Sequence, residues 1–256
     1  MTPATDDAAL LAKGLTLSWD GGETIVARNI DLAVRRGETL CLVGKSGCGK
    51  TTILHALSGL TTPMEGRVLV HGKDVTGKPG SVSYMLQKDM LLPHLRVIDN
   101  VALPLTLGGT PRSEARDKAA NLFERFGLAG TELEWPSQLS GGMRQRAAFL
   151  RTYLMGNDVV LLDEPFSALD ALTRVDLRNW WLQISCELGI ASLIITHDVD
   201  EAVSLSSSVL VLKGRPAEGV PSSIVGEVSI PRNVEGDFSL THEYVDCKRQ
   251  VLDLLG

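Results

Sequence analysis

The chain has 256 residues, of which 44% are hydrophobic and 22% are charged, and its formal net charge is -6. This length is enough for one large domain or two small ones with a sizeable core. The acidic balance argues against a dedicated nucleic-acid-binding protein, which usually carries a basic face, so we expect no nucleic-acid partner.

The sequence also bears on membranes and on redox state. No run approaches the ~20 apolar residues that span a bilayer. Met1–Ala9 contain Asp6 and Asp7 but no basic residue, so they lack the start of a signal peptide, and we expect a short disordered tail there. The four cysteines form no CxxC pair. We therefore expect reduced thiols in a cytosolic protein, which would serve a membrane as a peripheral subunit on its cytoplasmic side.

The first strand buried on both faces is predicted at Thr39–Val43, and a helix is predicted at Thr52–Leu57. Between them, residues 44–51, GKSGCGKT, fit the pattern GxxxxGK[ST] in full. In this context the backbone N–H groups and the helix N-terminus surround phosphate oxygens. We expect Lys50 to reach the β- and γ-phosphates and Thr51 to bind Mg²⁺. The alternative, a glycine-rich surface turn, is disfavoured because the motif is complete and correctly placed. We call residues 44–52 the cradle. The residues expected to bind ATP there are Gly44, Lys45, Ser46, Gly47, Cys48, Gly49, Lys50, Thr51 and Thr52.

A mainly helical stretch comes next. Thr110 and Pro111 are typical of an N-cap and a first helical residue, and Gly127 is typical of a helix end. A second helix is predicted to begin at Ser140. A third is predicted to follow Asp170 and to close at Gly189, with apolar residues at helical spacing.

Two more buried strands are predicted, at Val159–Leu162 and Leu193–Ile195. Asp163 and Glu164 follow the first of them directly. Because ligands bind at the carboxyl ends of strands in open α/β sheets, these carboxylates should face the cradle. Asp163 would then hold Mg²⁺ and Glu164 would polarise the attacking water.

Two features complete the pattern. The aromatic pair Trp180 and Trp181 lies on the apolar stripe of the third helix, so we interpret it as core packing. After Val209, short apolar runs alternate with Gly and Pro. We predict two or three small strands there, at the edge of the fold.

Residues 139–146, LSGGMRQR, resemble the signature of ABC ATPases. Ser140 is suited to cap a helix whose N-terminus, with Gly141 and Gly142, can bind an anion. The resemblance implies that this helix in one subunit faces the γ-phosphate held by a second copy, so that two ATP molecules join a homodimer. Most members have Gln where this chain has Met143.

Other positions fit the family in order. Gln87 resembles the glutamine that senses Mg²⁺ and water, residues 167–170, SALD, resemble the loop that pairs across the dimer, and His197 resembles the histidine that contacts the γ-phosphate. Trp19 stands where the family usually has a tyrosine stacked on adenine; taken alone it would be a core aromatic. The resemblance implies catalysis by Lys50, Gln87, Glu164 and His197, ATP binding by Trp19, Ser140, Gly141, Gly142 and Asp170 besides the cradle, and Mg²⁺ binding by Thr51, Gln87 and Asp163.

The resemblance covers roughly residues 10–232. It implies an α/β fold, a P-loop NTPase core of ABC type with a small antiparallel β region and a helical subdomain. We expect a single ABC ATPase domain over residues 1–256, with the core and β region at 1–90 and 157–256 and the helical subdomain at 91–156.

Finer motifs resemble one branch of the family, the ATPase subunits of bacterial importers for nitrate, sulfonates, taurine and thiamine precursors. These are YMLQ at 84–87, LLP at 91–93, EPFSALD at 164–170 and RP at 215–216, whereas Lys45 and SSS at 206–208 depart from that branch. The resemblance implies an importer of a small polar or anionic solute, with permease subunits in the membrane and, indirectly, a solute-binding protein as partners. A soluble regulatory ABC ATPase is the alternative. The members that act on DNA insert a long coiled coil, for which Thr51–Leu139 leaves no space.

Two hypotheses concern single segments. Cys48 lies beside lysine and helix-terminal positive charge, which favour a reactive thiolate, and an inert small residue is an equal alternative. Residues 87–100 hold Met90, Leu91, Leu92, Pro93 and Leu95 in a predicted loop. We interpret them as a docking surface for the membrane partner, against the alternative that they pack the helical subdomain.

Overall fold

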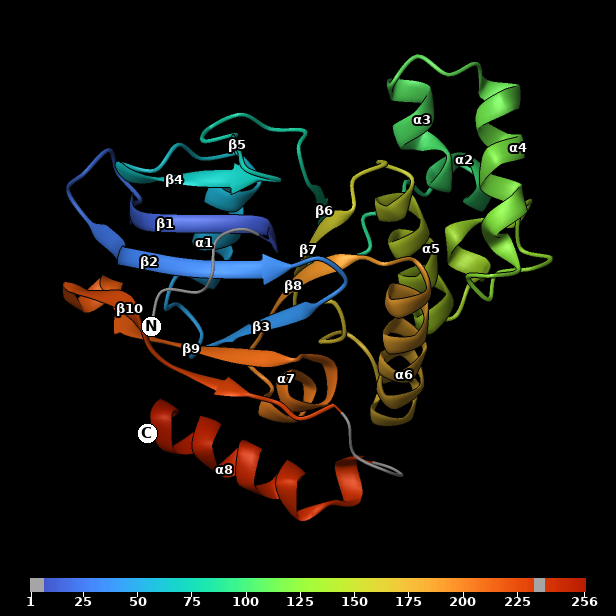
Figure 1. Ribbon diagram of the computed structural model, residues 1–256. Helices are drawn as coiled ribbons and strands as arrows, with labels where there is room; N and C mark the ends of the chain where they lie inside the picture. Colours follow the sequence, from blue (N-terminus) through green and yellow to red (C-terminus); the bar gives the residue numbers. More distant parts are fainter. Residues whose placement is uncertain (1–6, 233–237) are drawn as a thin grey trace.

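The computed structural model describes residues 7–232 and 238–256. Figure 1 shows one long sheet with helices on both sides and a separate group of helices at one end. In the described residues the strands are β1 (Ala8–Ser18), β2 (Ile25–Arg35), β3 (Thr39–Val43), β4 (Glu65–Val70), β5 (Lys73–Asp74), β6 (Ser83–Met85), β7 (Val159–Asp163), β8 (Ala191–Thr196), β9 (Ser208–Arg215) and β10 (Val220–Ser229). The helices are α1 (Lys50–Leu57), α2 (Val97–Val101), α3 (Leu103–Leu107), α4 (Arg112–Phe123), α5 (Gly141–Tyr153), α6 (Ala171–Glu187), α7 (Val199–Leu205) and α8 (His242–Leu255).

The strands follow the order β5-β4-β1-β2-β10-β9-β3-β8-β7-β6. β9, β3, β8, β7 and β6 are parallel neighbours, whereas β1 pairs antiparallel with β2 and β4. Every residue of β7 and β8 is buried. Alternate side chains of β3 enter two different cores, one with α5 and α6 and the other with α1. Strands covered on both faces read as nearly continuous apolar runs. The three strands that were predicted from such runs are confirmed.

Three expectations need correction. β9 and β10 lie inside the sheet and not at its edge, because β9 pairs with β3 in parallel. The expected tail at the start is too long, since Ala8 and Ala9 already belong to β1; residues 1–6 lie outside the described residues. α8 was not predicted. It packs against α7, β9 and β10 through the buried side chains of Cys247 and Val251.

The helix starts follow the predicted signals closely, but α4 ends at Phe123, four residues before the predicted end at Gly127, and residues 124–127 form turns. Ser140 caps α5 by accepting a hydrogen bond from the N–H of Met143, and Asp170 caps α6 by accepting one from Thr173. α4 begins one residue later than predicted, with Pro111 at the capping position. Trp181 is buried and stacks on Phe149, with ring centroids 4.6 Å apart, so its interpretation as core packing is confirmed.

The helices α2 to α5 lie together beyond the β6 end of the sheet (Figure 1). Asp99 on α2 ties this layer together. Its buried carboxylate accepts hydrogen bonds of 3.1 and 3.0 Å from Arg112 and of 2.8 and 2.7 Å from Arg116, both on α4. These hydrogen bonds and charges lower the pKa of Asp99 to about 2 despite its burial. Since α2 also packs on α5, these ion pairs of Asp99 with Arg112 and Arg116 support the helix that carries the signature.

We expect Asp99→Asn to lower the free energy of unfolding by about 1–2 kcal/mol at pH 7, because both arginines are partly exposed and screened. The folded-state pKa is lowered, so the stabilisation is fully present above the unfolded-state pKa of about 4 and is lost as the pH falls towards about 2. Urea unfolding at pH 5 and pH 8 should therefore give the same difference between the variant and the native chain. If Asp99→Asn and the native chain are equally stable at pH 7, the ion pairs of Asp99 do not stabilise the fold.

Candidate functional site

The cradle lies between β3 and α1. Gly49 caps α1 with φ 95°, and a Cβ there would lie 2.5 Å from Cγ1 of Val26, so only glycine fits. The Nζ of Lys50 donates to the carbonyls of Gly44 (2.7 Å) and Lys45 (3.2 Å), which places its ammonium group inside the curl of the loop. The loop residues Lys45, Ser46 and Gly47 are exposed. The cradle therefore combines accessible backbone N–H groups, a helix N-terminus and one central cation, as phosphate binding requires.

Cys48 points away from this surface. Only 2% of the residue is exposed, and a Cβ on Gly44 would lie 2.7 Å from its Sγ. Burial raises the pKa of the Cys48 thiol, and the opposing effect of Lys50 is smaller. The hypothesis of a reactive thiolate is therefore wrong, and the alternative of a small inert residue agrees with the structure.

Trp19 lies beside the first turn of α1. Its Nε1 donates a hydrogen bond of 3.2 Å to the hydroxyl of Thr52, and 51% of the residue is exposed. It is therefore not a core aromatic. A half-exposed indole fixed next to the cradle presents a flat apolar surface on which a base can stack.

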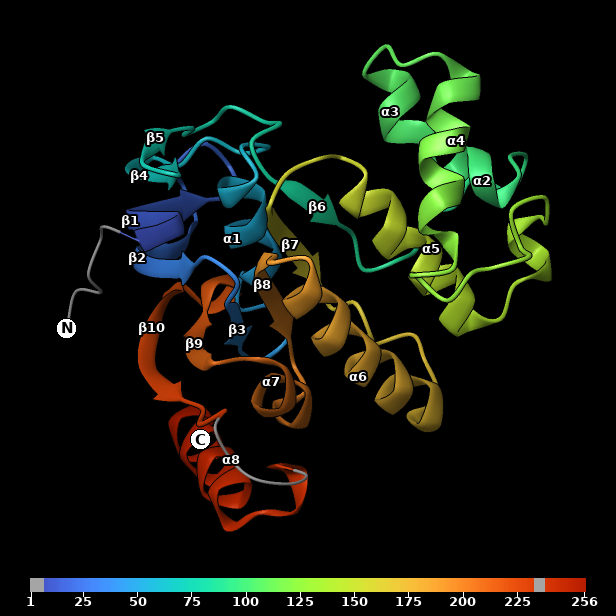
Figure 2. The same ribbon diagram turned by 45° about the vertical axis from the view of Figure 1, so that its right-hand side comes forward.

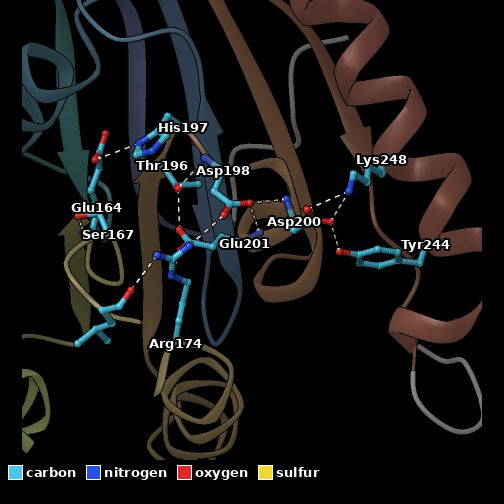
Figure 3. Close-up of polar contacts among 11 residues, drawn as sticks. Glu164, Ser167, Arg174, Thr196, His197, Asp198, Asp200, Glu201, Tyr244 and Lys248 are labelled. Carbon is cyan, nitrogen blue, oxygen red and sulfur yellow. Dashed lines mark hydrogen bonds and ion pairs between the residues drawn. The ribbon is translucent and has the colours of Figure 1, made fainter. Parts of the chain in front are cut away.

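Three predicted catalytic residues meet at the ends of β6, β7 and β8. The amide nitrogen of Gln87 donates to Oε2 of Glu164 at 3.2 Å, and Nδ1 of His197 lies 3.1 Å from the same oxygen. Figure 3 shows the Glu164 and His197 side chains pointing towards each other. The backbone of Glu164 has φ 44° and is anchored by a hydrogen bond of 2.9 Å from its N–H to the carbonyl of Ile195. A left-handed conformation is costly for a side chain of this size and is typical of functional turns.

Asp163 provides the second carboxylate. It is buried at the end of β7, accepts a hydrogen bond of 3.3 Å from the hydroxyl of Tyr84, and is also hydrogen-bonded by Thr51. Burial raises the pKa of Asp163, the effect expected of a desolvated carboxylate that a cation would stabilise.

The donor set fits magnesium. Thr51 offers a hydroxyl, Asp163 a carboxylate, and Gln87 its amide oxygen, because its nitrogen is engaged by Glu164. All three are the hard oxygen ligands that Mg²⁺ prefers, with substrate phosphates and water completing the shell. Among residues 7–232 and 238–256, no group of three His, Cys, Asp or Glu side chains could hold a metal alone.

The signature lies elsewhere in the chain. Ser140 is exposed at the start of α5, and a Cβ on Gly142 would lie 2.8 Å from the methyl group of Thr173 on α6. Gly141 and Gly142 therefore face the residues around Asp170. In Figures 1 and 2, α5 and the cradle helix α1 lie on opposite sides of β6 and β7. The structure thus brings the signature next to Asp170 but does not bring it to the cradle of the same chain.

The segment that follows Gln87 needs one correction. Leu91 is 8% exposed and packs in the core, so the alternative of subdomain packing holds for this residue. Leu92 and Leu95 are half-buried, and Met90 is 55% exposed. Among the apolar residues of this segment, Met90 and Pro93 are exposed and available as part of a docking surface.

The residues behind His197 were not predicted. The buried side chains of Thr196 and Glu201 and the half-buried side chain of Arg174 connect the His197 loop to α6 (Figure 3). The available signals were weak: an acidic residue in the first turn of a short helix, and an arginine four residues after Asp170.

A family model described as ABC transporter matches residues 27–167. This span is more than half of the chain and contains the cradle, the signature and Glu164. The chain belongs to the ABC transporter family. It is an ATP-binding and ATP-hydrolysing protein of that family, as the sequence predicts.

Curated relatives of this ABC ATPase belong to importers. The formylaminopyrimidine import ATP-binding protein ThiZ of Halalkalibacterium halodurans is 37% identical over 90% of either chain. The taurine import ATP-binding protein TauB of Pseudomonas aeruginosa is 38% identical over 81% of this chain and 80% of the relative. The aliphatic sulfonates import ATP-binding protein SsuB 2 of Burkholderia lata is 39% identical over 100% and 96%. The predicted resemblance to this importer branch is confirmed.

Solved structures confirm the predicted fold class. cbiO1 from Clostridium perfringens, part of the ABC transporter complex cbiONQ, has a TM-score of 0.76 at 25% identity, over 86% of this chain and 88% of that chain. The cassette MJ0796, in a dimeric post-hydrolysis state bound to ADP and Pi, has a TM-score of 0.72 at 26% identity, over 87% and 99%. No helix in the described part of the ABC ATPase has the length and apolar character to cross a membrane.

Thiol labelling tests the environment of the cradle. Cys41, Cys48 and Cys247 are buried and their thiol pKa values are raised by burial, whereas Cys186 is exposed. Because a maleimide reacts with an accessible thiolate, we expect mass spectrometry of the folded chain at pH 7 to find label on Cys186 alone. The unfolded chain, as a control, should label at all four. Labelling of Cys48 as fast as Cys186 in the folded chain would contradict this assignment.

Proposed function

We propose that this ABC ATPase powers the import of a small polar or anionic solute and that Glu164 is the general base of ATP hydrolysis. The observation that carries the proposal is the meeting of Gln87, Glu164 and His197 at adjacent strand ends. A carboxylate held by two neighbours, directly after the buried Asp163, can orient a water molecule for attack on a phosphate.

The residues divide the chemistry between them. Lys50 exchanges its two carbonyl partners for oxygens of the β- and γ-phosphates. The backbone N–H groups of the loop donate hydrogen bonds to the other phosphate oxygens. Thr51, Asp163 and Gln87 hold Mg²⁺, which when bound neutralises charge on the phosphates. Glu164 accepts a proton from the water that attacks the γ-phosphorus, as the bond to ADP breaks. His197 fixes the Glu164 carboxylate and lies at the edge that faces the γ-phosphate.

A second copy of the chain completes the site. Ser140 is exposed at the N-terminus of α5, which Gly141 and Gly142 continue, and such a helix start is suited to an anion. α5 lies on the other side of β6 and β7 from the cradle helix α1 of its own chain (Figure 2). The dimeric state of the similar cassette MJ0796 supports a homodimer with ATP at its interface. Residues 1–256 then act as one ABC ATPase domain, with residues 91–156 as the helical subdomain and Trp19 stacked on adenine.

The membrane side of the proposal depends on the relatives. ThiZ, TauB and SsuB 2 are import proteins by name, and cbiO1 is part of a transporter complex. We place this chain at the cytoplasmic face of the membrane, bound to permease subunits that receive the solute from an external binding protein. A soluble regulatory ABC ATPase would instead purify without any integral membrane partner.

The docking surface comprises Met90, Leu133 and Trp135. Met90 precedes the helical layer, and Leu133 and Trp135 lie in the turns of the same layer. Arg96 donates to the carbonyl of Leu133 at 2.7 Å and stacks 3.7 Å above the ring of Trp135. Exposed apolar residues at these positions are typical of a protein-binding surface. A helix of a permease loop lying in this region would be close to Gln87 and could follow the state of the nucleotide.

Substitution of the base should separate binding from turnover. Glu164→Gln keeps the size of the side chain but removes the proton acceptor, so we expect unchanged ATP affinity and turnover lowered by ~10²-fold or more. Lys50→Ala should weaken nucleotide binding itself. Glu218→Gln, at an exposed carboxylate on the η3 turn Pro216–Glu218, is the matched control and should leave both unchanged. Phosphate release and nucleotide titration measure the two quantities, and native turnover in Glu164→Gln would show that Glu164 is not the base.

The docking surface can be tested without touching the catalytic residues. Met90 has φ 48°, a conformation that Asp tolerates better than most residues. We therefore expect Met90→Asp to fold, to keep the basal ATPase rate of the isolated subunit, and to lose membrane association and uptake. Leu252→Asp changes an equally exposed apolar residue on α8, far from the helical layer, and is the control. Normal uptake with folded Met90→Asp would rule out this surface.

A further inference from the structure

The backbone on both sides of His197 is held by a buried hydroxyl. The Oγ1 of Thr196 donates to Oε2 of Glu201 at 2.7 Å and accepts from the N–H of Asp198 at 3.0 Å. Asp198 in turn caps α7, because its Oδ1 accepts from the N–H groups of Asp200 and Glu201. The direction in which His197 leaves the end of β8 is therefore set by the residues around it and not by His197 itself.

Arg174 on α6 connects this loop to another segment. One Nη donates to the carbonyl of Leu169 at 2.9 Å. The other Nη lies 3.7 Å from Oδ2 of Asp198, and Nε lies 3.8 Å from Oε1 of Glu201. Figure 3 shows the Arg174 guanidinium group beside Asp198 and Glu201, the two carboxylates that follow His197 in the chain. A planar guanidinium can hold a fixed geometry with several partners at once, which a lysine cannot do.

The surroundings make this link dependent on the arginine. Glu201 is 2% exposed, and burial raises its pKa, opposed by its hydrogen bond from Thr196 and by the nearby arginines. Arg178, one helical turn after Arg174, acts on Glu201 through its charge, but no hydrogen bond or ion pair joins it to Leu169 or Glu201 in the described structure. Arg174 alone therefore combines the charge with the contact to the Leu169 carbonyl.

We propose that Arg174 is a positioning residue that couples the loop Ser167–Asp170 to His197. The inference rests on the proposed function, because it gives a role to the contact between His197 and Glu164. Ser167–Asp170 lies next to the signature and is the segment that a second copy would meet. A shift of the Leu169 carbonyl on dimer closure then moves Arg174, the two carboxylates and the His197 backbone together. Seating of the second copy then adjusts, through His197, the position that the Glu164 carboxylate already has in the single chain.

The first test compares two arginines on the same helix. Arg174→Met removes the guanidinium group and keeps an unbranched side chain, and we expect kcat to fall by ~10-fold or more with KM within about 2-fold, because catalysis depends steeply on sub-ångström placement. Arg178→Met removes an equal charge without the contact to Leu169 and should keep kcat within about 2-fold. If Arg174→Met unfolds because Glu201 is left unpaired, Arg174→Met with Glu201→Gln removes that charge, restores the melting temperature and should still show the low kcat. Native kcat in folded Arg174→Met, or in the folded double variant Arg174→Met with Glu201→Gln, overturns the proposal.

A double-mutant cycle with His197→Ala separates positioning from general stability. If Arg174 acts through His197, Arg174→Met should lower the single-turnover rate of the native chain by ~10-fold and cause no further loss in the His197→Ala background. An equal loss in both backgrounds means that Arg174 acts by another route and overturns the inference, while the function of Glu164 and His197 stands. A native rate in His197→Ala alone overturns both the site assignment and the inference that rests on it.

Discussion

The site depends on the burial of the parallel half of the sheet on both faces. β3, β7 and β8 have no solvent-facing side, so charged side chains appear only at or beyond the ends of these strands. Because the strands are parallel neighbours, their ends meet at one edge, and the cradle, Glu164 and His197 come together there. β6 adds Gln87 to the same edge. The hydrophobic effect thus decides where the chemistry can be, before any polar contact is made.

The polar contacts then set the geometry of that edge. Glu164 adopts a positive φ and is fixed by Gln87, His197 and the Ile195 carbonyl. His197 is itself fixed by hydrogen bonds that its neighbours make with each other. Preorganisation of this kind is the main contribution a protein makes to phosphoryl transfer, in which charge stabilisation matters more than covalent chemistry.

Much of this site could be predicted from the sequence, because its elements are local. A complete glycine-rich motif, a buried strand that ends in Asp163 and Glu164, and caps at Ser140 and Asp170 are each visible within about ten residues. What the sequence did not reveal depends on contacts between distant segments. β9 lies in the middle of the sheet because it pairs with β3. The Cys48 thiol is desolvated by the packing around Gly44, and Arg174 reaches Asp198 and Glu201 only once α6 lies against α7. The roles of the individual site residues stay predictions until variants are measured.

The central claim is that the hydrolytic site is completed by the signature of a second copy. Sedimentation of the slow Glu164→Gln chain, with and without an added Ser140→Arg change, tests it most directly. The account predicts that Glu164→Gln is a monomer alone and a dimer with Mg-ATP, and that Ser140→Arg abolishes the dimer while the monomer binds ATP with unchanged affinity. If Ser140→Arg instead weakens ATP binding to the monomer, or leaves the ATP-dependent dimer intact, the composite site is contradicted.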